Sequence, residues 1–126
     1  MKSVALVVDD DPLVLKTTAL MLSKAGYEIL AANNGKQALE LCKKREAPIH
    51  LLLTDINMPD VNGYELASCM VEKYPKTRVL FMTGANINTE AQGEISGKIE
   101  AVNWSVLHKP FSWESLTEAV EGSPPS

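Results

Sequence analysis

The sequence has little of what marks secreted or membrane proteins. Its only two cysteines, Cys42 and Cys69, lack CxxC spacing, so we expect reduced, partly buried thiols and neither a disulfide framework nor a redox site. No apolar run approaches the roughly 20 residues of a membrane span. The first apolar run is short and ends in acidic residues, unlike the core of a signal peptide. We therefore expect a cytoplasmic protein.

Positive charge is also scarce. The chain has 12 Lys and Arg against 16 Asp and Glu, for a net charge of −4. Direct binding to nucleic acid usually requires a basic face, and an anionic membrane surface attracts clustered Lys and Arg. The composition therefore argues against both kinds of partner.

What the chain does contain is the pattern of an α/β domain. Hydrophobic residues make up 45% of its 126 residues, enough for one domain to bury a core. Short apolar runs alternate with amphipathic stretches, as in βα units around a parallel sheet. We predict strands at 4–8, 27–31, 49–53, 79–82 and 105–108, and helices at 13–25, 35–44, 63–74 and 113–121. The result is a (βα)5 doubly wound domain over residues 1–121, followed by a flexible tail or the start of a linker at 122–126.

Local signals set several helix boundaries. Asp11 and Ser112 are suited to be N-caps, and Gly26 is suited to end a helix. We expect the helix at 63–74 to turn Cys69 inward. A further helix is expected within 86–103, but two glycines weaken the helical pattern there, so the conformation of this stretch stays open.

Carboxylates follow two of the predicted strands directly. Asp9, Asp10 and Asp11 come after the first strand, and Asp55 comes after the third. In an open parallel sheet the carboxyl ends of neighbouring strands meet at one edge, where ligands bind. If these two strands are neighbours, the carboxylates repel one another unless a cation lies among them. Oxygen ligands favour a hard divalent ion such as Mg2+. The alternative for the acidic triplet is a solvated turn and a helix cap, and Asp11 fits the cap.

Two further polar residues end strands of the same sheet. Thr83 follows the fourth strand and Lys109 follows the fifth. Each has a plain alternative, a turn-forming threonine and a surface lysine in a loop. Together with the carboxylates, a hydroxyl and an ammonium form a receptor for a phosphoryl group.

Four motifs occur in order at these strand ends: VVDDDP, LLLTDINMPDVNG, FMTG and HKPF. With them, residues 3–121 resemble a receiver domain of the two-component response-regulator family, and the chain looks like the chemotaxis regulators among them. The resemblance implies a flavodoxin-like five-stranded sheet with strand order 2-1-3-4-5. It implies that Asp55 is the phosphoacceptor and that Asp9 and Asp10 hold Mg2+, together with Asp55 and the backbone carbonyl of Asn57.

The same resemblance assigns the remaining roles. Thr83 matches the switch hydroxyl and Lys109 the lysine that contacts the phosphoryl group, and the Lys109–Pro110 peptide is expected to be cis. The phosphoryl group would come from a sensor histidine kinase or a histidine phosphotransfer protein. Such a domain catalyses only its own phosphorylation and dephosphorylation, so it is not otherwise an enzyme. Phosphorylation would switch the surface formed by the fourth helix, fifth strand and fifth helix.

Two features depart from the family pattern. Val106 stands where the family usually has an aromatic switch residue, and Trp104, on the same strand face, is a candidate replacement. The alternative is that Trp104 only packs against the neighbouring helix. The interval from Thr83 to Lys109 is also a few residues longer than usual, and the usual Gly-Ala before the last strand is missing.

Other functions are weaker matches. A hydrolase that forms an aspartyl phosphate typically needs a second aspartate where this chain has Asn57. A flavodoxin-like redox or nucleotide module needs a phosphate loop where the chain has three acids. A receiver that acts without phosphorylation, as a protein-interaction module, is the alternative that stays open. The sequence does not identify the pathway, the cognate kinase, the oligomeric state or an output domain beyond residue 126.

Overall fold

A single five-stranded parallel sheet organises the chain in the computed structural model, which describes residues 3–56, 58, 60–84 and 104–121. Its strands run in the order β2-β1-β3-β4-β5, which confirms the predicted fold and strand order. The strands are β1 (Val4–Val8), β2 (Glu28–Ala32), β3 (Leu51–Asp55), β4 (Arg78–Thr83) and β5 (Trp104–His108). The helices are α1 (Pro12–Lys24), α2 (Gly35–Lys44), α3 (Gly63–Lys73) and α5 (Trp113–Glu121). The helix expected within 86–103 lies outside the described residues.

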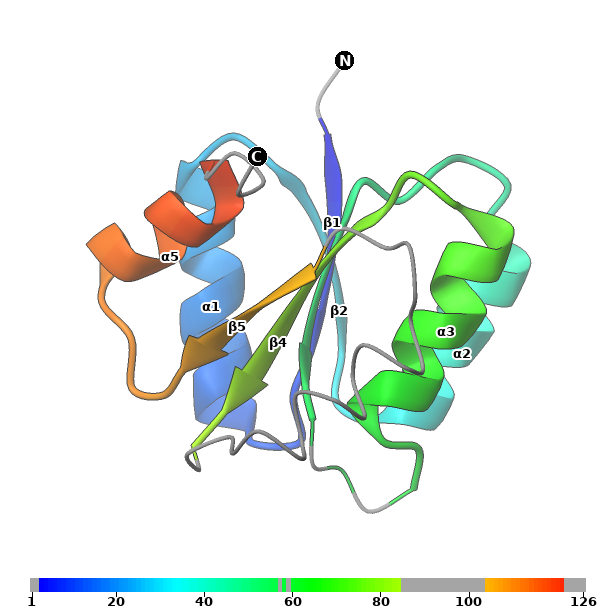
Figure 1. The fold of residues 1–126 in the computed structure, drawn as a ribbon, viewed down its shortest axis with the longest axis horizontal. Helices are drawn as coiled ribbons and strands as arrows, with labels where there is room; N and C mark the ends of the chain where they lie inside the picture. The colour runs from blue at the N-terminus through cyan, green and yellow to red at the C-terminus, as the bar shows by residue number, and fades with distance from the viewer. Residues whose placement is uncertain (1–2, 57, 59, 85–103, 122–126) are drawn as a thin grey trace.

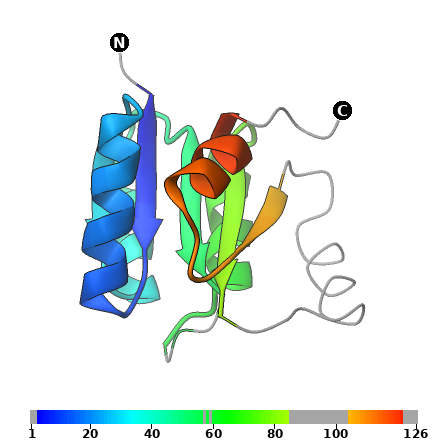
Figure 2. The ribbon, with the colours of Figure 1, turned by 90° about the vertical axis from the view of Figure 1, so that its left-hand side faces the viewer.

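Helices cover both faces of the sheet. Helices α1 and α5 lie on one face, and α2 and α3 lie on the other (Figure 1). Figure 2 shows the sheet after a quarter turn, with the carboxyl ends of the strands directed toward the same edge. Because both faces are covered, β1 and β3 are buried along their whole lengths and read as unbroken apolar runs.

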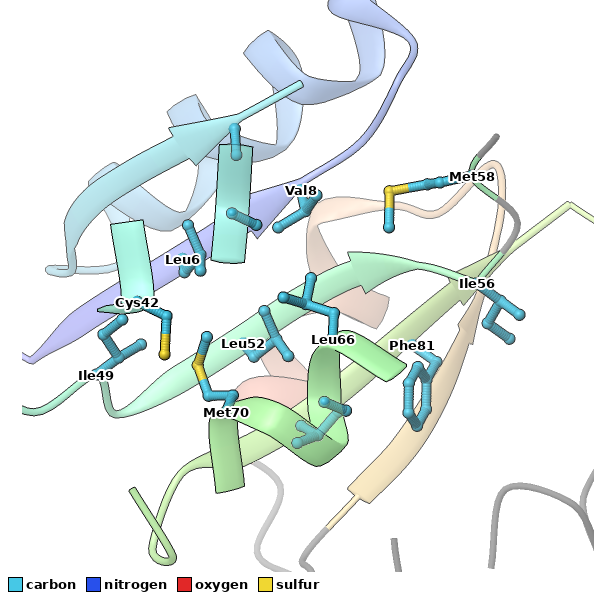
Figure 3. Packing of buried hydrophobic residues seen from close by; sticks show 14 of the residues in the cluster. Leu6, Val8, Cys42, Ile49, Leu52, Ile56, Met58, Leu66, Met70 and Phe81 are labelled. Atoms are coloured by element: carbon cyan, nitrogen blue, oxygen red, sulfur yellow. The ribbon is translucent and has the colours of Figure 1, made fainter. Parts of the chain in front are cut away.

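Side chains alternate between two cores, as expected for strands. Leu6 and Leu52 point to the side of α2 and α3, where Leu66, Met70 and Phe81 join the same cluster (Figure 3). Each large side chain buried in this way stabilises the fold by about 1.5–3 kcal/mol. A second cluster on the other face joins central-strand residues to α1 and α5. Apolar packing therefore stabilises the middle of the sheet, and the polar residues lie at the ends of the strands.

Most predicted boundaries match the structure to within one or two residues. The helices at 35–44 and 113–121 begin and end as predicted. Asp11 caps α1 by accepting from the N–H of Leu13 at 3.0 Å, and Ser112 accepts from the N–H of Ser115 at 3.0 Å. Gly26 follows α1 with a φ of 104°, a conformation that favours glycine, so the predicted stop is confirmed.

Two predictions need correction. The strand predicted at 49–53 is found at Leu51–Asp55, because its pairing with β4 continues to the Asp55–Met82 register. Cys69 is exposed, so the prediction that it faces inward was wrong. Cys42 is buried, and burial raises the pKa of its thiol. Among the described residues, no helix is both long and apolar enough to cross a membrane.

Candidate functional site

The carboxyl edge of the sheet gathers three acidic residues. Asp9 directly follows β1 and Asp55 ends β3, and these strands are neighbours paired through Val8 and Thr54. As a result, one carboxylate oxygen from each of Asp9, Asp10 and Asp55 lies within 4.8 Å of the others. The strand order thus brings together the acids that the sequence predicted would meet.

These acids differ in exposure. Asp9 is fully buried at 0% and Asp55 is 8% exposed, whereas Asp10 is exposed to solvent. The Asp9 carboxylate accepts a hydrogen bond from the N–H of Asp11 at 2.9 Å. Burying a carboxylate is costly unless charged or polar partners compensate. The site therefore depends on partners for Asp9 and Asp55.

Lys109 is such a partner for both buried acids. Its Nζ lies 2.7 Å from Asp9 Oδ2 and 3.1 Å from Asp55 Oδ2. Burial alone would lower the pKa of Lys109, but the hydrogen bonds and charges of Asp9 and Asp55 outweigh it and raise this pKa. When ionised, the three carboxylates and one ammonium leave two negative charges in excess. That excess matches the charge of one divalent cation.

Thr83 lies beside Lys109. It is the last residue of β4, buried, and its carbonyl accepts from the N–H of Lys109 at 2.8 Å. The Lys109–Pro110 peptide is cis, as the resemblance implied. The structure thus brings Asp9, Asp10 and Asp55 to one edge with Lys109, and Thr83 next to it. Asn57, predicted to offer its carbonyl to the metal, lies outside the described residues.

Strand β3 is followed by a closely packed turn into α3. The N–H of Gly63 donates to the carbonyl of Ile56 at 2.9 Å. A Cβ at Gly63 would lie 2.5 Å from the carbonyl oxygen of Asp55, closer than such atoms can approach. Only glycine therefore fits where α3 starts against the main chain of Asp55.

One polar residue of this turn was missed in the sequence. The carboxylate of Asp60 accepts from the N–H groups of Gly35 at 3.3 Å and Lys36 at 2.9 Å, at the start of α2. Gly35 and Lys36 are 25 and 24 residues away in the sequence, and no local sequence pattern predicts such a contact. The available signal in the sequence was an acidic residue shortly after Asp55 that caps no helix near it in the chain.

Val106 and Trp104 lie as the strand pattern predicts, on the side of α2 and α3. Val106 pairs with Phe81, and Trp104 pairs with Val79 near the amino end of β4. The Trp104 ring lies edge-on to Phe81, with ring centroids 6.2 Å apart. Trp104 therefore packs against the core at the other end of β4 from Thr83. A switching role for its ring stays a prediction.

Comparison with known proteins agrees with this geometry. The family model of the response regulator receiver domain matches residues 5–121. The chain is 34% identical to the response regulator receiver protein CpdR of Brucella abortus (strain 2308) over 119 residues, 92% of each protein. It is 28% identical over 119 residues to the transcriptional regulatory protein GlrR of Escherichia coli (strain K12), covering 92% of this chain but 25% of that protein.

Among solved structures, it is similar to the chemotaxis response regulator CheY4 of Vibrio cholerae. The TM-score is 0.80 at 26% identity, covering 97% of this chain and 98% of that one. The family match covers every described helix and, apart from Val4, all residues of the five strands. This chain therefore belongs to the response regulator receiver domain family.

Proposed function

We propose that the chain is a phosphoacceptor of a two-component phosphorelay, phosphorylated on Asp55 in a Mg2+-dependent reaction. The observation that carries this proposal is the convergence of three carboxylate oxygens within 4.8 Å of one another, beside the Lys109 ammonium. No purely structural purpose requires so many like charges at the edge of a stable sheet, where they oppose folding.

The donor atoms of the site suit a magnesium ion. Asp9, Asp10 and Asp55 would hold it, together with the main-chain carbonyl of Asn57. All are oxygen donors, and the excess of two negative charges fits a hard divalent ion. When bound, the ion offsets repulsion between the acceptor carboxylate and the incoming phosphoryl oxygens.

The protein's own groups then carry the transfer. A carboxylate oxygen of Asp55 forms a bond to phosphorus as the bond from phosphorus to the donor nitrogen or oxygen breaks, and the donor leaves with that electron pair. Lys109 Nζ, already 3.1 Å from Asp55 Oδ2, contacts the developing negative charge. The Thr83 hydroxyl would hold another phosphoryl oxygen. The transfer is therefore mainly positioning and electrostatics.

Partners would recognise the phosphorylated state at the surface formed by β5 and α5. Because Lys109 follows β5 directly and Thr83 ends β4, new bonds to the phosphoryl group would draw both loops toward Asp55. A local change of charge then biases a nearby surface between two arrangements. The catalytic role is limited to the domain's own phosphorylation and dephosphorylation.

An apolar groove beside the site suits the phosphodonor protein. It has a volume of about 400 Å3 and is lined by α1 residues and by the segment from Lys109 to Phe111. Leu13, at its rim, is 72% exposed. A histidine kinase or histidine phosphotransfer protein seated there would bring its phosphohistidine to Asp55. We also propose a cytoplasmic location, as expected from the sequence. The phosphorylated domain would act on an output domain or on a separate target protein of its pathway.

The test is the intact mass of the protein after incubation with acetyl phosphate and Mg2+. We expect a gain of one phosphoryl group that disappears when EDTA replaces Mg2+ and in Asp55→Asn. Folding of the variant is checked by circular dichroism. No gain at saturating donor and Mg2+ would contradict the proposal, and binding of a partner that ignores beryllofluoride would favour the phosphorylation-independent alternative.

A further inference from the structure

The carboxylate of Asp60 joins the acceptor loop, the segment 56–62 between β3 and α3, to the start of α2. One oxygen accepts from the N–H of Gly35 at 3.3 Å and the other from the N–H of Lys36 at 2.9 Å. Both donors belong to the first turn of α2 and have no partner within the helix itself. Asp60 thus uses both of its oxygens to hold one helix end.

Charge strengthens this contact. The first turn of α2, all of which the structure describes, contains no acidic residue, although the positive end of a helix dipole favours one. Asp60 supplies the missing negative charge from another part of the chain. Hydrogen bonds from the main-chain N–H groups, that of Lys36 foremost, lower the pKa of Asp60, so it stays ionised at neutral pH.

Close packing adds to the hydrogen bonds. A Cβ at Gly35 would lie 2.6 Å from Cβ of Val61 and 2.7 Å from its carbonyl oxygen. The loop therefore lies directly on the main chain of α2. Met58, in the same loop, is buried in the core with Val8, and Figure 3 shows the two side chains close together.

The loop is also tied to the acceptor. The N–H of Ile56, next to Asp55, donates to the carbonyl of Met82 at 3.1 Å, and the carbonyl of Ile56 accepts from Gly63. Between Asp55 and α3 the loop is thus fixed at its start, at its end and, through Asp60, near its middle. Asp60 thus adds a third anchor, on another helix, to the described residues between Asp55 and α3.

We propose that Asp60 is a positioning residue for the metal and phosphoryl chemistry of Asp55, acting by clamping the acceptor loop onto the first turn of α2. Asp60 would bind neither the metal nor the phosphoryl group; it would hold in place the chain that leads from Asp55 into α3. This inference rests on the proposed function. Residues that orient ligands in this way typically affect metal affinity by 10- to 100-fold.

The test compares three variants by titration calorimetry with Mg2+ alone, which does not require phosphorylation. Asp60→Ala removes the clamp, and Asp60→Asn removes the charge but keeps one accepting oxygen. Asn34→Ala is the matched control, because Asn34 caps the same helix locally by accepting from the N–H of Gln37 at 2.7 Å. Thermal unfolding and circular dichroism show how far each variant is destabilised.

We expect Asp60→Ala to weaken Mg2+ binding about 10-fold, Asp60→Asn to weaken it less, and Asn34→Ala to leave it unchanged despite a similar loss of thermal stability. Weakening of the same size in Asn34→Ala would assign the effect to the stability of α2 and overturn the proposal. Unchanged Mg2+ binding in Asp60→Ala would overturn it as well. Mg2+ binding by a wild-type protein that is never phosphorylated would refute the proposed function but not the clamp.

Discussion

At the amino edge of the sheet polar side chains bond to the main chain, whereas at the carboxyl edge charged side chains face one another. His50 Nδ1 accepts from the N–H of Val4 at 2.9 Å, which holds the start of β1. The Thr77 hydroxyl, buried just before β4, donates to the carbonyl of Ile49 at 2.5 Å. Both side chains satisfy main-chain groups that would otherwise lie unpaired near the core.

At this amino edge, side chains also bond to the main chain at the end of helix α2. The Lys73 ammonium donates to the carbonyls of Cys42 at 2.6 Å and Arg45 at 2.7 Å, at the end of α2. The Tyr74 hydroxyl donates to the same Arg45 carbonyl at 2.5 Å. A positive charge at a helix C-terminus is also favoured by the helix dipole. These side chains therefore stabilise the fold.

The carboxyl edge is different because its charged side chains interact with one another. Lys109 bridges Asp9 and Asp55, and Asp10 stays exposed beside them. The groups there are close enough to repel, so any incoming cation or phosphoryl group changes their balance. The polar groups of the amino edge thus stabilise the fold through main-chain hydrogen bonds, whereas the clustered carboxylates of the carboxyl edge oppose folding unless a cation joins them.

The largest effect that tests this contrast is expected for Lys109→Met. Loss of the ammonium leaves the buried Asp9 without its ion pair, which should lower the free energy of unfolding by about 3 kcal/mol without Mg2+. Part of this loss should return when Mg2+ is added. The rate of phosphorylation by acetyl phosphate should fall about 100-fold, because a group that stabilises developing charge is gone. Urea unfolding and intact mass measure the two effects, and a variant that keeps the wild-type rate would contradict this role.

A smaller effect is expected at the other edge, for Thr77→Val. The substitution keeps the shape of the side chain but leaves the Ile49 carbonyl without its hydroxyl donor, so the free energy of unfolding should fall by about 1–2 kcal/mol. Phosphorylation by acetyl phosphate should proceed at the wild-type rate. A changed Mg2+ dependence in this variant would show that the two edges are not independent.

The smallest effect is a pH dependence at the carboxyl edge. Asp9 and Asp55 raise the pKa of Lys109 in the folded protein. The stability that this group contributes is therefore fully present below its unfolded pKa of about 10.4 and is lost as the pH rises through its higher folded pKa. Urea midpoints of the wild type and Lys109→Met, measured without Mg2+ from pH 8 upward, should converge at alkaline pH. A constant difference between the two proteins would rule out this linkage.

Much of this protein could be predicted from local sequence. The apolar runs predict the strands because a strand covered on both faces must be apolar throughout. Asp11, Gly26 and Ser112 mark helix ends because their side chains, or the lack of one, act within a few residues. The motifs at the strand ends predict the carboxylate site for a similar reason, since parallel neighbours must end at the same edge.

Tertiary structure decided what depends on distant partners. Pairing with β4 extends β3 to Asp55, and the packing of α3 leaves Cys69 exposed. The contacts of Asp60 with Gly35 and Lys36 span 25 and 24 residues. The positions of the charged residues at the strand ends could be read from local composition and periodicity. The carboxylates that share the Lys109 ammonium, and the one that binds the start of α2, could not, because hydrogen bonds and ion pairs act over a few ångströms in space and not along the sequence.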